Sequence, residues 1–295
     1  MNDSSKMPLF SVVIPYYNDS KFIEETLDSL VVQSLNDFEV IIIDDCSQDS
    51  DELTRILSMD KYCALDVTLK RNSINMNGSH CRNLGIVLSR GEYICFLDSD
   101  DLWREDKLYE VKMALLSNPD VEVLYSQVEF LHDSITTEVR PEKGICGDAS
   151  EYLFLEGGFI QTSSIVVSRQ LALKVKFNDK FKRHQDYDFC LRLSREAKFS
   201  FIKKPLVYYR TGGDIYRRRA DDLEFCDYWL DNVCTYMSSD GYYGYKVFAY
   251  NARLFYAKKY LKVLVNTLSS FGKLSLRGKV KFLKKLKLIL FNWLR

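Results

Sequence analysis

The regular alternation of short apolar runs with amphipathic segments over the first 125 residues constrains the fold most. Five runs are largely apolar over the length of a buried strand, at 10–14, 38–43, 65–69, 93–97 and 121–125. Four segments between them space their apolar residues as a helix does, at 22–34, 51–57, 80–88 and 104–117. Apolar strands that alternate with helices are typical of a parallel sheet covered on both sides. We therefore predict an α/β fold with a Rossmann-like, mostly parallel sheet sandwiched by helices.

The pattern becomes less regular after residue 125. It indicates short strands near 164–167, 199–203 and 206–209 and a helix over about 185–196. Residues 221–292 have mostly helical spacing, with breaks expected near Asp240–Gly241 and near Gly272. We therefore expect a helical C-terminal extension after the sheet.

The charges of the chain are unevenly distributed. The segment from Gly241 to Arg295 holds 13 basic residues and no acidic one. The first 240 residues hold the remaining 28 basic residues and all 41 acidic ones. A difference of this size between segments indicates two surfaces with different partners.

Residues 279–295 have the pattern of a basic amphipathic helix. Phe282, Leu286, Ile289 and Trp293 fall on one helical stripe, and most of the lysines lie off it. Such a helix suits the surface of an anionic membrane; the alternative is a helix packed on the domain or on a partner, with its lysines in water. We find no run of about 18 apolar residues and no secretory signal pattern at the N-terminus. We therefore expect a cytoplasmic protein, peripheral on the inner face of the cell membrane.

Several function classes lack their sequence signatures. Neither a P-loop motif nor GxGxxG follows the first predicted strand, so an ATPase or an NAD-binding domain is not expected. No nucleic-acid recognition motif accompanies the basic C-terminal segment, so no nucleic-acid partner is expected. The eight cysteines form no CxxC pair and are expected to be reduced thiols packed as small hydrophobes.

Polar clusters follow three of the predicted strands, at Pro15–Asn18, Asp44–Asp49 and Asp98–Asp101. Because the carboxyl ends of parallel strands share one rim, these clusters are expected to meet there. Their carboxylates can bind a divalent cation, bind a ribose or base, or cap the next helix. Capping is favoured for Asp49 and Asp101, which lie where helices are expected to begin. Metal or substrate binding is favoured for Asp100, and for Asp98 the alternatives are balanced.

A second acidic cluster, Gln185–Asp188, opens the helix expected over 185–196. Acids in a first turn can simply complement the helix dipole. At about 100° per residue, however, Asp186 and Asp188 lie roughly 200° apart, so they cannot share one face. One can point into a cleft while the other pairs elsewhere, for instance with Arg192. Asp186 is our candidate for a general base.

Six segments carry a resemblance to a known family: Ser11–Asn18, Leu27–Ser34, Ile43–Asp49, Cys81–Gly85, Gly91–Asp101 and Asp186–Arg192. In this order and spacing the chain resembles the family 2 glycosyltransferases, which are inverting enzymes with the A-type nucleotide-diphospho-sugar transferase fold. The resemblance extends from about Phe10 to Gly213. It implies a glycosyltransferase domain over 1–215, with a nucleotide-sugar half at about 8–125 and an acceptor half at 126–215. Residues 216–295 would be a helical, basic C-terminal region.

The resemblance also implies roles for individual residues. The positions that would bind the donor are Pro15, Tyr17, Asp45, Arg82, Asp98 and Ser99. Asp45 would accept a hydrogen bond from a uracil-type N–H, and Asp100 with Asp98 would form the DXD motif that holds Mn²⁺ or Mg²⁺. Asp186 matches the catalytic base, and Tyr209–Arg210 matches a pair on the strand that closes the active site. Two positions depart from the family: Gln185 replaces a Glu, and Thr211-Gly-Gly replaces a frequent His.

The function that this resemblance implies is metal-dependent, inverting transfer of a hexose from a nucleotide-diphospho-sugar, expected to be a UDP-sugar. The acceptor would be a hydroxyl of a glycan or lipid-linked molecule in the biosynthesis of a surface polysaccharide such as capsule or lipopolysaccharide. The alternative is a non-catalytic nucleotide-sugar-binding or scaffold subunit of a membrane-associated assembly complex. The sequence leaves open the sugar, the acceptor and whether the chain forms a homo-oligomer.

Overall fold

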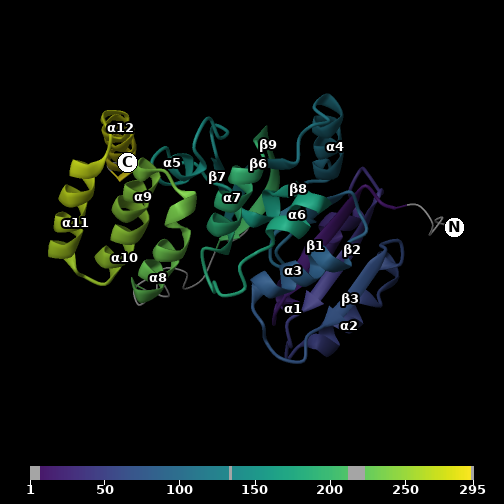
Figure 1. Cartoon of the computed structure of the whole chain (residues 1–295). Coiled ribbons are helices and arrows are strands. Elements are labelled where there is room, and N and C mark those ends of the chain that lie inside the picture. The colour runs from purple at the N-terminus through teal and green to yellow at the C-terminus, as the bar shows by residue number, and fades with distance from the viewer. Residues whose placement is uncertain (1–6, 133–134, 212–222, 294–295) are drawn as a thin grey trace. The chain divides into compact units, whose positions relative to one another are not determined.

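The computed structural model describes residues 7–132, 135–211 and 223–293, with side chains as far as residue 287 (Figure 1). The chain divides into two compact units. The first comprises 1–142, 160–189 and 196–211, and the second comprises 143–159, 190–195 and 212–295.

A mixed sheet forms the centre of the first unit. Its strands are β1 (Phe10–Tyr16), β2 (Phe38–Asp44), β3 (Val67–Arg71), β4 (Tyr93–Phe96), β5 (Leu102–Trp103), β6 (Val123–His132), β7 (Ile135–Arg140), β8 (Val166–Ser168) and β9 (Phe199–Thr211). The strand order is β3-β2-β1-β4-β8-β6-β9-β5, and β7 pairs with β6. Strands β3, β2, β1 and β4 are mutually parallel, which confirms the prediction for this half. The other half is mixed, because β8 is antiparallel to both of its neighbours.

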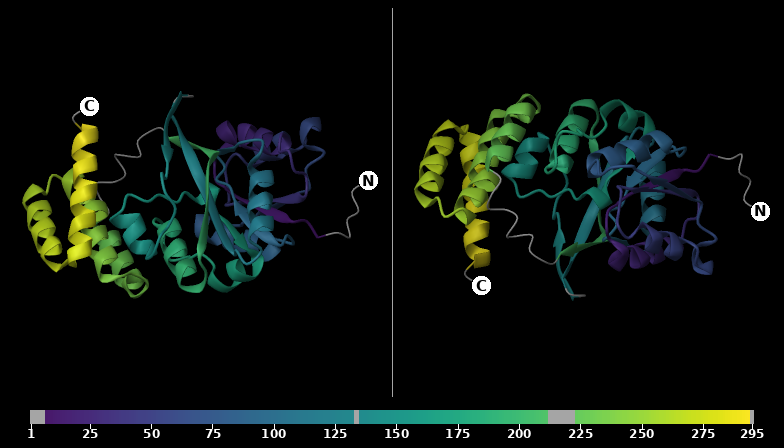
Figure 2. Two further views of the ribbon diagram at one scale, coloured as in Figure 1. Left: turned by 90° about the horizontal axis from the view of Figure 1, so that it is seen from above. Right: turned by 90° about the horizontal axis from the view of Figure 1, so that it is seen from below.

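Helices lie on both sides of the sheet. They are α1 (Ser20–Val31), α2 (Ser50–Leu57), α3 (Gly78–Leu88), α4 (Lys107–Ser117), α6 (Arg169–Val175) and α7 (Gln185–Glu196), with 3₁₀ turns at Asp60–Tyr62 and Thr162–Ser164. One of them, α7, also contributes residues 190–195 to the second unit. Helices α1 and α2 lie on one side of the sheet and α3 on the other (Figure 2). All seven residues of β2 are buried, as expected of a strand covered on both faces.

The sheet also differs from the prediction in its second half. The strands expected at 199–203 and 206–209 are one strand, β9, in which Pro205 lies where the register with β6 shifts. A proline cannot donate a ladder hydrogen bond, and it is accommodated at such an irregularity. Strands β5 and β7 and helix α6 were not expected. Each is short or lacks a clear apolar period.

Gly85 allows α3 to pack closely on β1. A Cβ at this position would lie 2.2 Å from Val13 Cγ1. Gly85→Ala is therefore expected to lower the free energy of unfolding by about 1–3 kcal/mol, measured by urea denaturation. The control is Gly272→Ala, where an added Cβ meets nothing within 4 Å. That variant should gain up to about 1 kcal/mol from helix propensity. Equal effects of the two substitutions would contradict the packing argument.

The second unit is helical in the part that the structure describes. Its helices are α5 (Ala149–Phe154), α8 (Leu223–Val233), α9 (Ser239–Tyr245), α10 (Asn251–Tyr256), α11 (Tyr260–Lys273) and α12 (Leu276–Trp293), with a 3₁₀ turn at Cys234–Tyr236 and a π-helical segment at Lys246–Tyr250. Phe154, Trp229 and Tyr245 pack their rings together in its core. Among the described residues, no helix has both the length and the apolar character needed to cross a membrane.

Helix breaks occur near both predicted positions, each displaced by a few residues: one lies before Ser239 and the other between Lys273 and Leu276. Asp240 and Gly241 lie inside α9, because Ser238 accepts a hydrogen bond from Gly241 N and caps the helix before them. Gly272 lies inside α11, which ends one residue later. The break follows at Leu274–Ser275, where Asp240 Oδ1 accepts a hydrogen bond from Ser275 N at 2.8 Å.

The membrane-facing role that the sequence favours for the apolar stripe of the C-terminal helix does not hold at Phe282. This side chain is 5% exposed and packs with Leu155, Val247 and Leu274. An aromatic ring buried in the core of the unit is unavailable to a membrane. At this position α12 is therefore packed on the protein, which was the alternative to membrane binding. Ile289 and Trp293 belong to the stripe but lie beyond the described side chains.

Candidate active site

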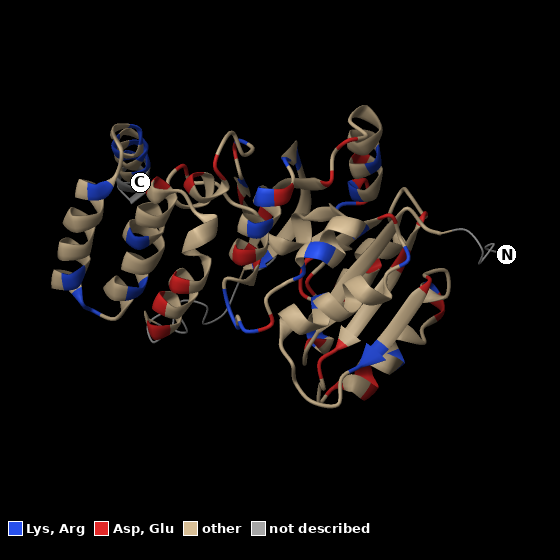
Figure 3. Ribbon diagram, in the orientation of Figure 1, with Lys and Arg blue, Asp and Glu red and all other residues tan. Residues whose placement is uncertain are grey.

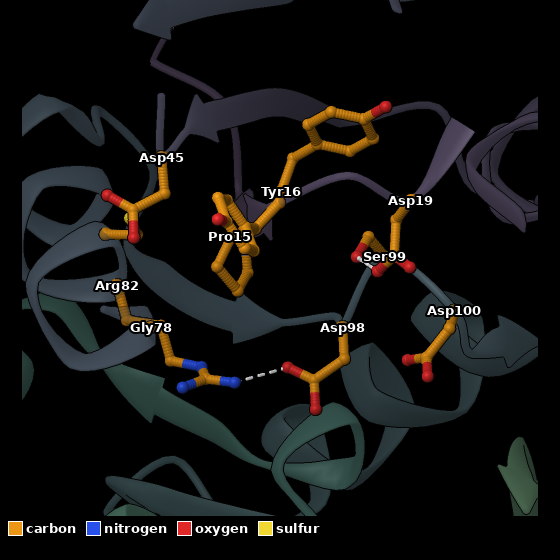
Figure 4. A pocket seen from close by; sticks show the side chains of 11 residues that line it. Pro15, Tyr16, Asp19, Asp45, Gly78, Arg82, Asp98, Ser99 and Asp100 are labelled. Atoms are coloured by element: carbon orange, nitrogen blue, oxygen red, sulfur yellow. Dashed lines mark hydrogen bonds and ion pairs between the residues drawn. The ribbon is translucent and has the colours of Figure 1, made fainter. Parts of the chain in front are cut away.

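An open cavity of about 250 Å³ lies at the carboxyl ends of β1, β2 and β4 (Figure 4). The predicted donor and metal positions that line it are Pro15, Tyr17, Asp45, Arg82, Asp98, Ser99 and Asp100. Sequence reasoning missed Tyr16, Asp19, Gly78 and Cys81, which also line it. The shared rim of a parallel sheet therefore brings these segments, far apart in the sequence, to one site.

Asp45 lies at the end of β2 and organises the loop that leads into α3. Its Oδ1 accepts hydrogen bonds from Asn72 Nδ2 and Met76 N, each at 2.8 Å. Its Oδ2 accepts one from Asn77 N at 2.8 Å. Asn77 has a φ of 77° and caps α3. Because a carboxylate oxygen has two lone pairs, Oδ2 retains capacity for a further donor.

Arg82, on α3, connects the end of β4 with the start of α7. Its Nη2 donates to Asp98 Oδ1 at 2.5 Å (Figure 4), and its Nη1 donates to Gln185 Oε1 at 2.9 Å. The guanidinium lies over the Phe177 ring, 5.5 Å from its centroid. Gln185 supplies a neutral acceptor, and Asp98 is the carboxylate that pairs with Arg82.

Asp101 is a structural anchor of the acidic turn, and the prediction that it caps a helix is wrong. The next helix, α4, begins only at Lys107, because β5 intervenes. The Asp101 side chain is fully buried and accepts hydrogen bonds from Ser163 Oγ at 2.6 Å, Gln161 Nε2 at 2.7 Å and Arg210 N at 3.0 Å. These bonds fix the turn that carries Asp98 and Asp100.

Two further contacts hold the same rim together. Asp49 lies at the N-cap position of α2, as expected, but its side chain makes no capping hydrogen bond to that helix. Its Oδ2 instead accepts a hydrogen bond from Ser20 N at 2.9 Å, at the start of α1. Ser99 Oγ donates to a carboxylate oxygen of Asp19, which brings Asp19 to the acidic turn (Figure 4). Asp19 had no sequence signal beyond its position after the first strand.

Asp100 has the environment of a cation ligand. Burial, with the negative charges of Asp98 and Asp19, raises the pKa of its carboxyl to about 7. Within the described residues, no other side chain donates a hydrogen bond to this carboxylate, although Arg210 Nε donates to its backbone oxygen at 2.8 Å. The described residues contain no cluster of three ligating side chains that would enclose a metal by themselves. The donor set therefore fits Mg²⁺ or Mn²⁺ held by one or two carboxylates together with substrate oxygens.

Asp186 lies in the first turn of α7, which the sequence placed correctly at 185–196. Its Oδ1 accepts a hydrogen bond from Tyr187 N at 2.9 Å. Burial raises the pKa of this carboxyl, while the charge of Arg82 opposes the rise and that of Asp98 adds to it. Asp186 is thus electrostatically coupled to the cavity without lining it. Asp188 is 1% exposed.

Tyr209 and Arg210 are adjacent residues of β9, and their side chains interact with different groups. Burial raises the pKa of the Tyr209 hydroxyl, and the nearby charges of Asp101, Asp98 and Asp186 add to this. Arg210 Nη2 donates to Glu25 Oε2 at 2.8 Å. Residues 212 and 213, which depart from the family, and the basic run Arg217–Arg219 lie outside the described residues.

The chain is similar in sequence to known proteins. The family model described as Glycosyl transferase family 2 matches residues 11–172. The amylovoran biosynthesis glycosyltransferase AmsB of Erwinia amylovora is 38% identical over 251 residues, which cover 81% of this chain and 82% of that protein.

Two solved structures share the fold. The structure of S. aureus TarS residues 1–349 in complex with UDP-GlcNAc has a TM-score of 0.63 at 17% identity, covering 93% of this chain and 78% of that one. The mannosyltransferase PcManGT from Pyrobaculum calidifontis, in complex with GDP-Man and Mn²⁺, has a TM-score of 0.58 at 17% identity, covering 97% of this chain and 81% of that one.

Proposed function

This chain belongs to glycosyl transferase family 2, and from that premise we propose a metal-dependent, inverting transfer of a sugar from a nucleotide-diphospho-sugar to an acceptor hydroxyl. The observation that carries the proposal is the single cavity that Asp45, Arg82, Asp98 and Asp100 share. A base, a ribose and a diphosphate need donors, acceptors and a cation site within reach of one another, and these side chains supply them.

The nucleotide would lie between the ends of β1, β2 and β4. Pro15 and Tyr17 offer an apolar and an aromatic surface for the base, and Asp45 Oδ2, beside the bond that it accepts from Asn77 N, can accept a base N–H. An acceptor at this position suits a base whose ring carries an N–H, as the uracil ring does. We therefore propose a UDP-sugar as donor, and the UDP-GlcNAc complex of a protein with the same fold supports this choice.

The diphosphate would lie near Asp100, Asp98 and Arg82. A divalent cation bound there supplies charge neutralisation for the leaving diphosphate. Asp100 would hold this cation, with Asp98 as second carboxylate, and Arg82 adds a positive charge on the other side of Asp98. The Mn²⁺ complex of a protein with this fold supports Mn²⁺ or Mg²⁺ as the cation.

Asp186 would act as the general base. Its carboxylate would take the proton of an acceptor hydroxyl as that oxygen attacks the anomeric carbon opposite the leaving diphosphate. A single displacement inverts the anomeric configuration and needs no protein nucleophile. Burial of Asp186 suits this role, since a raised pKa makes the carboxylate a stronger base.

The acceptor would be a glycan or a lipid-linked sugar in surface polysaccharide synthesis, which the similarity to an amylovoran biosynthesis glycosyltransferase supports. Hexose transfer in the synthesis of a capsule or lipopolysaccharide fits the same chemistry. The predicted peripheral location on the inner face of the membrane would bring the enzyme to such acceptors. A non-catalytic binding subunit would need neither a buried Asp186 with a raised pKa nor a buried Asp100 beside two other carboxylates.

A panel of nucleotide-sugars tested by thermal shift checks the donor proposal. With Mn²⁺ present, a UDP-sugar should raise the melting temperature, by about 2–4 °C for each kcal/mol of binding free energy gained. ADP- and CDP-sugars should raise it less, because the neutral adenine and cytosine rings carry no N–H for Asp45 to accept. Asp45→Asn serves as the matched variant and should reduce the preference for UDP. A stronger shift with an ADP-sugar would contradict the assignment of Asp45.

A further inference from the structure

Helix α11 packs its polar side against the neighbouring residues of the second unit. Asn251, on α10, donates through Nδ2 to Thr267 Oγ1 at 2.8 Å. Asn266 Nδ2 donates to Asn251 Oδ1 at 2.7 Å and to Lys246 O at 2.9 Å. Asn251 and Ser270 are 6% and 2% exposed. This network of buried amide and hydroxyl groups fixes the rotation of α11 about its axis, because turning the helix would leave these groups unpaired.

The apolar side of α11 therefore points outward. Leu261, Leu264, Val265 and Leu268 are 74%, 56%, 59% and 64% exposed. They follow the i, i+3, i+4, i+7 spacing of one helical face, which we call the α11 face. A helix on the surface of a soluble protein normally buries its apolar face and exposes its polar side. Helix α11 has the opposite orientation, so a continuous apolar stripe is exposed. Exposed stripes of this kind mark sites of interaction with a protein or a membrane.

Positive charge surrounds the α11 face. Lys258, Lys259 and Lys262 are exposed beside it, and α11 and α12 carry Lys and Arg but no Asp or Glu (Figure 3). Phe255, near the end of α10, and Tyr260, the first residue of α11, pack edge to face with ring centroids 5.3 Å apart, and both are more than half exposed. An aromatic pair with adjacent lysines is typical of helices at the level of lipid headgroups.

We propose that the α11 face lies flat on an anionic lipid bilayer, with its leucines among the acyl chains and its lysines at the phosphates. The 14 residues of α11 extend over about 21 Å, too short to span the roughly 30 Å hydrocarbon core. A second copy of the chain does not fit this face, because two such surfaces would bring positive charge against positive charge. The lipid-binding surface is thus α11, in place of the Phe282 stripe that the sequence suggested.

Sedimentation of the full-length protein with sucrose-loaded vesicles tests this proposal. The protein should sediment with vesicles of phosphatidylglycerol and phosphatidylcholine in equal amounts, and much less with phosphatidylcholine alone. Leu264→Gln with Leu268→Gln should lower the partition coefficient at least about 10-fold. Lys258→Gln with Lys262→Gln should lower it about 10-fold, and only on the anionic vesicles.

The matched control is Met113→Gln with Leu116→Gln on α4. Leu116 is 64% exposed, the same as Leu268, so the control removes similar exposed apolar surface from the first unit. It should sediment like the unmodified protein. Equal sedimentation of the α11 variant and the unmodified protein would overturn the proposal, as would dimerisation in analytical ultracentrifugation that depends on Leu264 and Leu268. This assay needs neither donor nor acceptor, so its outcome is independent of the transfer reaction.

Discussion

Asp186→Asn is expected to lower the kcat for release of UDP from the donor by about 10²–10⁴-fold, the usual contribution of a general base. The amide has nearly the same shape as the carboxylate but cannot accept a proton at neutral pH. Because Asp186 does not line the nucleotide cavity, the dissociation constant of UDP with Mn²⁺ should change by less than about threefold, which corresponds to roughly 0.6 kcal/mol. Steady-state kinetics and calorimetric titration measure the two quantities.

Asp188→Asn is the control for this experiment. Asp188 is almost completely buried in the same helix, so its substitution should lower the melting temperature while the folded fraction keeps its turnover. Retention of normal kcat by Asp186→Asn, or an equal loss in both variants, would remove Asp186 from the role of base.

Asp100→Asn is expected to abolish the effect of Mn²⁺ on UDP binding and to lower turnover by about 10²-fold or more. Asp100 is the carboxylate on which the proposed cation site depends most. Measured without metal at pH 8, the same variant should nevertheless be more stable than the unmodified protein. The reason is that it removes a charge that is buried and also held close to Asp98 and Asp19.

The sign of this stability gain depends on pH. The pKa of Asp100 is raised to about 7 in the folded protein, against about 3.9 in an unfolded chain. Above pH 7 the carboxyl is charged in both states, and the folded state bears the full cost. Below pH 4 it is neutral in both states, and the cost disappears. The difference in melting temperature between the variant and the unmodified protein should therefore shrink as the pH falls from 8 to 5. A difference independent of pH would contradict this electrostatic environment.

The rim of the cavity could be predicted from the sequence because it depends on short-range patterns. The continuous apolar character of 10–14, 38–43 and 93–97 predicts parallel strands, and the polar clusters after them must then converge. This placed Asp45, Asp98 and Asp100 at one site without knowledge of any tertiary contact.

Long-range partners could not be predicted in this way. Asp101 has its hydrogen-bond partners 60 or more positions further along the chain, at Gln161, Ser163 and Arg210. Local sequence offers only the position before an expected helix, so capping was the natural interpretation. The missed role of Asp19 has the same cause, because its partner Ser99 lies 80 positions away.

The orientation of α11 illustrates a different limit. The spacing of Leu261, Leu264 and Leu268 predicts an amphipathic helix, but amphipathicity does not say which side packs against the protein. The answer comes from Asn251, a buried amide on a neighbouring helix that pairs with Thr267. A sequence pattern alone would have placed the leucines inside.

Release of UDP from a UDP-sugar, measured with Mn²⁺ and then with EDTA, tests the central claim most directly. Metal-dependent catalysis at Asp100 and Asp186 predicts turnover with Mn²⁺, its loss in EDTA and its recovery when excess Mn²⁺ is returned. Equal turnover in EDTA would contradict the metal site. Tight UDP binding with no turnover on any nucleotide-sugar and acceptor tested would contradict catalysis and favour a non-catalytic binding subunit.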